Sequence, residues 1–322
     1  MNKLIQKAQH LPVNEATSVI SVAPVIVPSP GRVVALEVRI SAPITGENLP
    51  IIILSHGHGP SLYIPSLNGY GPLANFWAAH GFVVIQPTHL NAKIYGLGPE
   101  ILRGQMLWRS RVEDMSRIVD RLELIEASVP GLIGRVDRTK IAAAGHSMGG
   151  QTVGMLLGAR LNDPLDKDAT DVNLMDKRFK AGVLLAAPGK GGDDLSEFTA
   201  KNYSFLNPDF SYMATPTLVV AGENDVAAHL TTRSADWYAD PYKLSPGNKS
   251  LLTVFGAKHG LGGIAGYDAA ETTDEDPDRL AVVQRLTWAY LHSAFYPDEH
   301  MWNAACEALA KSVEPLARIE SK

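Results

Sequence analysis

Residues 141–150 read IAAAGHSMGG and join a predicted strand to a predicted helix. The run Ile141 to Gly145 is apolar and of strand length, and Gly149 to Leu161 is predicted to be a helix. A serine that lies directly between a strand and a helix occupies a sharp, strained turn that exposes its hydroxyl. Gly145 and Gly149 suit such a turn, because a side chain at either position would collide with the neighbouring strand or helix. The stretch therefore predicts Ser147 as a catalytic nucleophile.

Strand-like runs alternate with amphipathic segments on both sides of this stretch. The other predicted strands are Val22–Val27, Val33–Ile40, Ile51–Leu54, Phe82–Gln86, Ala181–Ala187, Thr217–Ala221 and Leu251–Phe255. The other predicted helices are Leu73–His80, Trp108–Ala127 and Arg279–Phe295. This alternation predicts an α/β fold with a doubly wound, mostly parallel sheet, whose ligand site lies beyond the carboxyl ends of the strands.

The length and composition are those of one globular domain. The chain has 322 residues, of which 45% are hydrophobic and 20% charged, enough to bury a sizeable core. We expect a single domain over residues 1–322, with a core at about 20–296 and a helical C-terminal tail at 297–322. The less patterned stretches at about 89–106, 162–178 and 189–213 are expected to be insertions that form a lid or a pocket wall.

The composition also argues against several classes of protein. A net charge of −5 provides no basic surface for nucleic acid. The one cysteine, Cys306, excludes an internal disulfide and a cysteine-based zinc site. No stretch has 18 consecutive apolar residues, and residues 1–18 lack the apolar core of a signal peptide. We therefore expect no membrane span and a cytoplasmic location, and the sequence leaves a homo-oligomer open.

Ser147 needs a histidine as its base, because a serine hydroxyl is a weak nucleophile at neutral pH. In enzymes with this strand–serine–helix turn, the acid and then the histidine follow the serine along the chain. Four histidines follow Ser147, and only His259 comes just after a predicted strand. His229 opens a predicted helix, whereas His292 and His300 lie within or after the last helix. The sequence predicts His259 as the base.

The predicted acid is Asp225, which ends the loop after the strand Thr217–Ala221. A carboxylate is needed there to orient the histidine and to stabilise its charged form. Asp193 and Asp194 follow the preceding strand, and Glu223 is close to Asp225 in the same loop. These three carboxylates stay open as alternatives.

Two backbone N–H groups are expected to bind the negative oxygen that forms during acyl transfer. One belongs to Met148, the residue after the nucleophile. The other is expected in the glycine-rich segment Ser55–Gly59, where we favour the N–H of His58. The spacing of His56 and His58 could also suit a metal, but no further ligand cluster accompanies it, so neither a metal nor a cofactor is predicted.

These motifs resemble the platelet-activating-factor acetylhydrolase and chlorophyllase-like branch of the α/β hydrolases. The motifs that carry the resemblance are Ser55–His58, Gly145–Gly150 and Gly222–Asp225. The resemblance runs from about Ile51 to His259, and it implies that the N–H groups of His58 and Met148 form the oxyanion hole. Dienelactone-type enzymes of this branch carry a cysteine nucleophile, where this chain has serine.

Other polar and aromatic residues have a structural and a functional interpretation. Arg109, Arg111 and Asp114 on the predicted helix Trp108–Ala127 are interpreted as a solvated face or an ion-pair brace. Tyr267 and Glu271 follow His259 in a glycine-rich, acidic link that either fixes the histidine loop or edges the pocket. Aromatic residues that either wall a pocket or pack in the core are Tyr63, Phe76, Trp77, Trp108 and Trp237.

We therefore predict a carboxylic-ester hydrolase that acts on a small-molecule ester through Ser147, His259 and Asp225 and an acyl-enzyme intermediate. An amidase or peptidase with the same three residues is an alternative, because the acyl-enzyme chemistry is shared. A non-catalytic ligand-binding protein on the same fold is another, because folds are reused for many functions.

Overall fold

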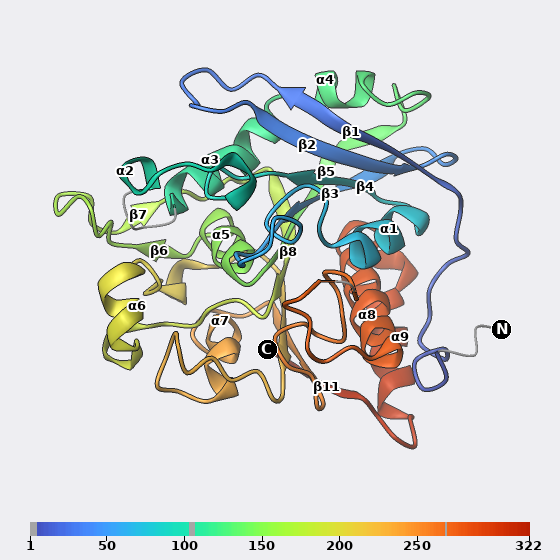
Figure 1. The fold of residues 1–322 in the computed structure, drawn as a ribbon. Coiled ribbons are helices and arrows are strands. Elements are labelled where there is room, and N and C mark those ends of the chain that lie inside the picture. Colours follow the sequence, from blue (N-terminus) through green and yellow to red (C-terminus); the bar gives the residue numbers. More distant parts are fainter. Residues whose placement is uncertain (1–4, 103–106, 268) are drawn as a thin grey trace.

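The strand before Ser147 lies in the middle of a large sheet. A computed structural model describes residues 5–102, 107–267 and 269–322, so residues 103–106 of the expected insertion 89–106 lie outside the described residues. Within the described residues the sheet has nine strands in the order β1-β2-β4-β3-β5-β8-β9-β10-β11 (Figure 1). The six strands from β4 to β10 in this order are parallel, whereas β1, β2 and β11 are antiparallel to their neighbours. The predicted α/β fold with a mostly parallel sheet is confirmed.

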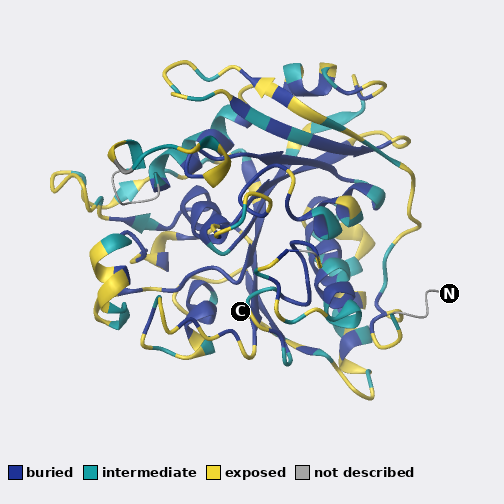
Figure 2. Ribbon diagram, in the orientation of Figure 1, coloured by how far each residue is buried: buried dark blue, intermediate teal, exposed yellow. Residues whose placement is uncertain are grey.

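Eight of the nine strands in the described part of the sheet agree with the predicted runs to within a few residues, except that β5 begins five residues early; β11 was not predicted as a strand. Their bounds are β1 Val19–Val27, β2 Leu36–Pro43, β3 Leu49–Ser55, β4 Val83–Pro87, β5 Val136–His146, β8 Phe179–Leu185, β9 Thr217–Gly222, β10 Lys249–Val254 and β11 Ala317–Ser321. Every residue of β3, β4, β9 and β10 is buried, and Figure 2 shows the middle of the sheet in dark blue. Such continuous apolar strands are typical of parallel sheets that are covered on both faces.

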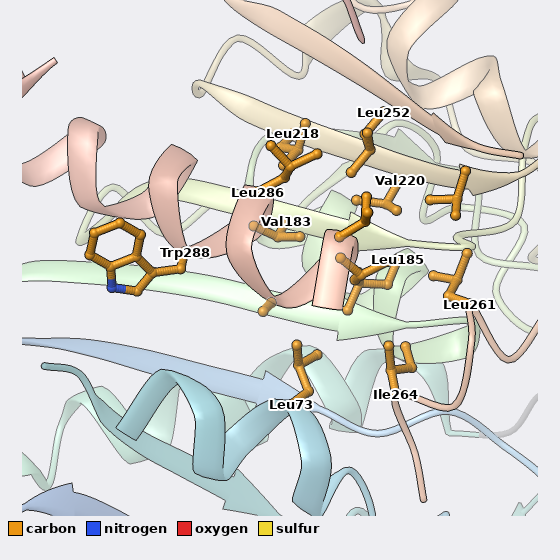
Figure 3. Packing of buried hydrophobic residues seen from close by; sticks show 14 of the residues in the cluster. Leu73, Val183, Leu185, Leu218, Val220, Leu252, Leu261, Ile264, Leu286 and Trp288 are labelled. Atoms are coloured by element: carbon orange, nitrogen blue, oxygen red, sulfur yellow. The ribbon is translucent and has the colours of Figure 1, made fainter. Parts of the chain in front are cut away.

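Helices cover the two faces of the sheet and create two hydrophobic cores. The longer helices are α1 Gly71–Ala79, α3 Trp108–Val119, α4 Leu122–Ala127, α5 Met148–Leu156, α8 Pro277–Phe295 and α9 Met301–Ala310. The core under α1 and α8 contains Ile52 and Leu54 of β3, together with Leu73, Leu286 and Trp288 (Figure 3). The core under α3 and α5 contains the alternate β3 residues at 51 and 53. This period of two follows from the pleat of the strand.

The remaining elements are short. They are η1 Lys93–Tyr95, α2 Pro99–Leu102, β6 Arg160–Leu161, β7 Val172–Asn173, η2 Gly192–Asp194, α6 Glu197–Asn202, η3 Phe210–Tyr212, η4 Ala235–Ala239, α7 Asp240–Lys243 and η5 Pro297–Glu299. None of the described helices has both the length and the apolar character needed to cross a membrane.

The predicted helix Trp108–Ala127 is broken into α3 and α4. The apolar spacing continues through the break, so the sequence pattern does not reveal it. Arg178 from the strand-poor segment after β7 binds the end of α3, where its guanidinium donates to Asp120 Oδ1 at 2.5 Å and to Ser116 O at 3.3 Å. Arg121 then adopts a non-helical backbone, with φ −123° and ψ 21°. A tertiary contact therefore accompanies the end of this helix.

Two other predicted helical segments end differently. The helix predicted over Gly149–Leu161 stops at Leu156, because Gly158 has φ +117°, a backbone conformation that L side chains rarely adopt. The helical tail predicted over residues 297–322 is wrong at its end, where β11 pairs antiparallel with β10. Residues 317–321 alternate between charged and less polar side chains, a pattern that suits an edge strand rather than a buried helix.

Candidate active site

Ser147 occupies a strained turn between β5 and α5. Its backbone has φ 55° and ψ −121°, a conformation that a residue with a side chain adopts only when its surroundings hold it there. The N–H of Ser147 donates to Leu185 O at 2.9 Å, and the N–H of Gly150 donates to Ser147 O at 2.8 Å. The end of β8 and the first turn of α5 therefore hold the turn from both sides.

The glycines around Ser147 allow a close approach of the backbone. A Cβ atom on Gly145 would lie 2.1 Å from Gly149 O, and one on Gly149 would lie 2.1 Å from Ser55 O. Real Cβ atoms do not approach backbone atoms this closely, so the predicted collisions at both positions are confirmed. The second contact brings α5 against the end of β3, where the predicted oxyanion loop begins.

Asp225 and His259 form a hydrogen-bonded pair at the ends of β9 and β10. Asp225 Oδ2 lies 2.8 Å from His259 Nδ1, and the Asp225 side chain is 3% exposed whereas that of His259 is 40% exposed. Asn224 N also donates to Ala257 O at 2.8 Å, which joins the two loops through their backbones. A carboxylate at Nδ1 selects the tautomer that carries its proton there, and so leaves Nε2 free to accept a proton.

The alternative acids make other contacts. Asp194 lies in η2, where its Oδ2 is 3.9 Å from Arg233 Nη1. Asp193 is in the same exposed turn. Glu223 Oε2 accepts a hydrogen bond from Gly256 N at 3.0 Å. Within the described part of the chain, Asp225 is the carboxylate that contacts the ring of His259.

His58, Ser147, Met148, Asp225 and His259 line one pocket of about 330 Å³. The structure thus brings together all five residues predicted for the site, although they come from four separate stretches of chain. Neither the N–H of His58 nor that of Met148 donates a hydrogen bond to any described residue. Both N–H groups are therefore available to an oxygen atom of a ligand in this pocket.

The rest of the pocket wall is apolar and aromatic. Its other lining residues are Pro188, Phe198, Tyr203, Leu206, Val226, Ala227, His229, Leu230 and Tyr238. Three of these come from the expected insertion 189–213, whereas the described residues of the stretches 89–106 and 162–178 do not line the pocket. No lysine or arginine is among the described residues of the wall.

The wall helix α6 is attached to the loop that follows Asp225. The hydroxyl groups of Ser196 and Thr199 both donate to His229 O, at 2.7 and 3.0 Å. Asp194 O accepts from Thr231 Oγ1 and from the N–H of Thr232, each at 2.8 Å. His229, one of the four histidines that follow Ser147, therefore lies in this pocket wall and binds α6 through its backbone oxygen.

A buried arginine binds the segment Ser55–Gly59, which is the predicted oxyanion loop. Arg111 on α3 is 0% exposed, and its guanidinium binds His56 O, Ser55 Oγ at 3.2 Å, and Thr152 Oγ1 on α5 at 3.0 Å. It also donates to Asn91 Oδ1 at 2.8 Å. The interpretation of Arg111 as part of a solvated face is wrong, because the loop after β3 covers this side of α3.

A second buried charge lies beside it. Asp114 binds Arg32 Nε at 3.0 Å and His89 Nδ1 at 3.0 Å, and His89 Nε2 lies 2.9 Å from Ser55 Oγ. The ion-pair interpretation of Asp114 is confirmed, and the pair is buried rather than exposed. Burial lowers the pKa of His89 well below its usual value, so its ring is neutral in this network.

Glu271 also supports the oxyanion loop. Its Oε1 accepts a hydrogen bond from Ser61 N at 2.9 Å, and a Cβ atom on Gly59 would lie 2.7 Å from the same oxygen. Glu271 and Tyr267 do not line the pocket among the described residues. Glu271 therefore contacts the loop after β3, which neither interpretation of the acidic link had placed beside it.

His56 and His58 have different surroundings. The ring of His56 is buried, with Nδ1 2.6 Å from Gly57 O and Nε2 accepting from His89 N at 3.0 Å. His58 lines the pocket. In the described part of the chain, no group of three or more histidine, cysteine or acidic side chains is arranged to hold a metal ion.

Comparison with known proteins gives one relative to report. No protein-family model matches the chain. The curated protein "Platelet-activating factor acetylhydrolase" of Cavia porcellus is 26% identical over 208 residues, which are 54% of this chain. The resemblance to this branch of α/β hydrolases is confirmed. The match covers 43% of the relative, so the chain corresponds to less than half of that protein's length.

Several residues of the pocket wall were not predicted from the sequence. Phe198 and Tyr203 line the pocket from a segment with little periodicity, and Tyr238 lies in η4. The aromatic residues considered from the sequence do not line it, and Trp77 and Trp237 are buried in the core. A long unpatterned segment between two buried strands is the one signal that could have indicated the first two.

Proposed function

We propose that this chain is a serine hydrolase that cleaves carboxylic esters at the pocket around Ser147. The observation that carries the proposal is the 2.8 Å contact between Asp225 Oδ2 and His259 Nδ1 in the same pocket as the strained serine. The similarity to a protein named an acetylhydrolase supports ester hydrolysis at the level of the family. The order of the three residues along the chain is also the one expected for this fold.

The reaction would proceed in two steps. Ser147 Oγ attacks the ester carbonyl while His259 Nε2 takes its proton, and the same proton then goes to the departing alcohol oxygen as the carbon–oxygen bond breaks. Water attacks the resulting acyl-serine with His259 as base again, which releases the carboxylic acid and restores the hydroxyl. Asp225 keeps Nδ1 protonated and stabilises the imidazolium that forms in each step.

The N–H groups of His58 and Met148 would stabilise the tetrahedral intermediate. Neither group donates to a protein acceptor among the described residues, and each such donor is worth about 3 kcal/mol of transition-state stabilisation. Arg111 and Glu271 hold the loop of His58 at His56 O and Ser61 N, so this donor is fixed before substrate arrives.

The pocket also suggests the kind of ester that it accepts. Its wall is mainly aliphatic and aromatic, and it presents no lysine or arginine among the described lining residues. A carboxylate or phosphate on the bound group would lose its hydration without gaining a cationic partner. We therefore propose an uncharged, apolar group in this pocket, with a neutral ester preferred over a matched ester that carries a terminal carboxylate.

Hydrolysis of short p-nitrophenyl esters tests the proposal. Ser147→Ala should lose activity by about 10⁵-fold or more, and Asp225→Asn by about 10⁴-fold. Asp194→Asn serves as the matched control, because it removes an acid that the sequence analysis left open, and it should retain activity. Equal hydrolysis by the wild type and Ser147→Ala would refute the proposal.

A fluorophosphonate probe gives an independent measurement. The wild type should be labelled at one site and Ser147→Ala should not, since the probe reacts with an activated serine. A wild-type protein that hydrolyses no ester and resists the probe would indicate a binding protein on this fold. Matched ester and anilide substrates would then show whether amide bonds are cleaved as well.

A further inference from the structure

His146, the residue before the proposed nucleophile, connects two loops that the mechanism needs. Its ring is buried, and Nε2 lies 2.8 Å from the backbone carbonyl oxygen of His259. Its Nδ1 lies 2.8 Å from the hydroxyl of Tyr70, which is 1% exposed. The same hydroxyl accepts a hydrogen bond from Gly57 N at 3.0 Å. A continuous chain of hydrogen bonds thus runs from Gly57, in the predicted oxyanion loop, to the backbone of His259.

The direction of every hydrogen bond in this chain is determined. The carbonyl oxygen of His259 can only accept, so Nε2 of His146 carries the ring proton. Nδ1 is then an acceptor, and it takes the hydroxyl proton of Tyr70. The Tyr70 oxygen in turn accepts from Gly57 N–H. Each of the donors and acceptors has its partner, so the chain stabilises one arrangement of the three loops.

Burial keeps both side chains in the protonation states that this arrangement requires. It lowers the pKa of His146 to about 3, so the ring is neutral near neutral pH. It also raises the pKa of the Tyr70 hydroxyl, which therefore keeps its proton. The rings of His146 and His259 lie 4.7 Å apart between centroids, and a neutral His146 does not repel the imidazolium that would form on His259.

The backbone of Tyr70 is itself held in an uncommon conformation. Its φ is 63°, in the left-handed region, just before α1. Its N–H donates to Ala265 O at 3.0 Å, in the glycine-rich segment that follows His259. Non-glycine residues adopt this conformation when the surrounding structure imposes it. Tyr70 is therefore held by the segment after His259 through its backbone N–H, and it contacts the segment Ser55–Gly59 through its hydroxyl.

We propose that Tyr70 and His146 are positioning residues that fix the oxyanion loop and the histidine loop relative to Ser147. This inference rests on the proposed function of Ser147 and His259. Gly57 precedes the proposed donor His58, and His146 precedes Ser147. A small displacement at either end would therefore misplace a reacting group, and displacements of about 1 Å can cost about a hundredfold in rate.

Tyr70→Phe is the sharpest test, because it removes one oxygen atom and leaves the ring in the core. It deprives Gly57 N–H of its acceptor and His146 Nδ1 of its donor. We expect kcat for p-nitrophenyl acetate to fall about tenfold or more, with KM little changed, because the substrate pocket is untouched. Rates are expressed per active site, counted from the final extent of fluorophosphonate labelling, so that a partly unfolded preparation is not read as slow catalysis.

Tyr296→Phe is the matched control. The hydroxyl of Tyr296 also makes a hydrogen bond with the backbone, since it donates to the carbonyl oxygen of Asn48 at 3.0 Å. Tyr296 does not line the pocket. This variant should keep the wild-type kcat and KM. A wild-type kcat per labelled site in Tyr70→Phe would overturn the inference. So would a change confined to KM or to the labelled fraction.

The double variant Tyr70→Phe/His146→Gln tests whether the two residues act as one chain. If they do, its rate loss should be close to the larger of the two single losses; a loss equal to their product would show independent effects and overturn the coupling. Should His146→Gln fail to fold, Tyr70→Phe alone still decides. An active Ser147→Ala variant would refute the proposed function itself, whereas an inactive one beside a fully active Tyr70→Phe would refute only this inference.

Discussion

Acidification from pH 7 to pH 5 should destabilise this protein strongly, because three histidines are buried as neutral rings. Burial lowers the pKa values of His56 and His89 well below 6.5, and the positive charge of Arg111 lowers them further. Burial lowers the pKa of His146 to about 3. In the unfolded chain each ring would titrate near 6.5.

The sign follows from the difference in bound protons. Between pH 6.5 and the lowered values, the unfolded chain binds protons that the folded chain does not, so the free energy of unfolding falls as the pH falls. For a group with a folded pKa far below 5, lowering the pH from 7 to 5 costs about 2 kcal/mol. His146, with a folded pKa of about 3, therefore contributes a loss of about 2 kcal/mol, and the lowered pKa values of His56 and His89 add to this loss in the same direction.

Urea unfolding at pH 7, 6 and 5, followed by tryptophan fluorescence, measures this slope. Trp77, Trp237 and Trp288 are buried and report on the core. His89→Asn should reduce the slope, whatever it does to stability at pH 7, since one ring whose pKa is lowered by burial is removed. A free energy of unfolding that stays constant from pH 7 to pH 5 would refute the reasoning.

Three further predictions concern stability. Burial, together with the positive charge of Lys322, lowers the pKa of Lys249 to about 8. Between about pH 8 and 10.5 the unfolded chain therefore binds a proton that the folded chain does not, and the free energy of unfolding should rise with pH. Urea titrations of Lys249→Met should lack this rise. Gly149→Ala should lower stability by about 3 kcal/mol in thermal melts, whereas Gly154→Ala in the same helix, with no atom closer than 3.8 Å to the new Cβ, should melt at or slightly above the wild-type temperature. Removing residues 317–322 should expose the edge of β10 and increase light scattering on mild heating, and scattering equal to that of the full chain would contradict this.

The central sheet and the serine turn were predictable because their signals are local. Buried strands are continuous apolar runs, and the turn at Ser147 needs small residues within five positions. The break after α3 was not predictable, because Arg178 binds that helix from more than fifty residues away in sequence. The strand β11 was missed although residues 317–321 alternate as an edge strand does, because five residues are a short signal and the pairing depends on the distant strand β10.

The structure places the five candidate residues in one pocket, while their catalytic roles stay a prediction. These residues lie at strand ends or in glycine-rich turns, and the parallel topology brings such positions together. The arginine beneath the oxyanion loop could not be recognised, because its charged neighbours on α3 suggest a surface. The aromatic wall came from a segment whose path depends on hydrogen bonds to the loop after Asp225.

Those hydrogen bonds have a consequence for how the pocket can change over evolution or in engineering. The segment that determines the breadth of the pocket is fastened to the loop that carries the proposed acid, through Ser196, Thr199 and Thr231. A change in the pocket wall would therefore also shift the loop that positions Asp225. If residues 189–203 alone were replaced by those of another protein, the new segment would lack the hydroxyl groups that bind the loop after Asp225. Residues 226–232 should therefore be exchanged together with them.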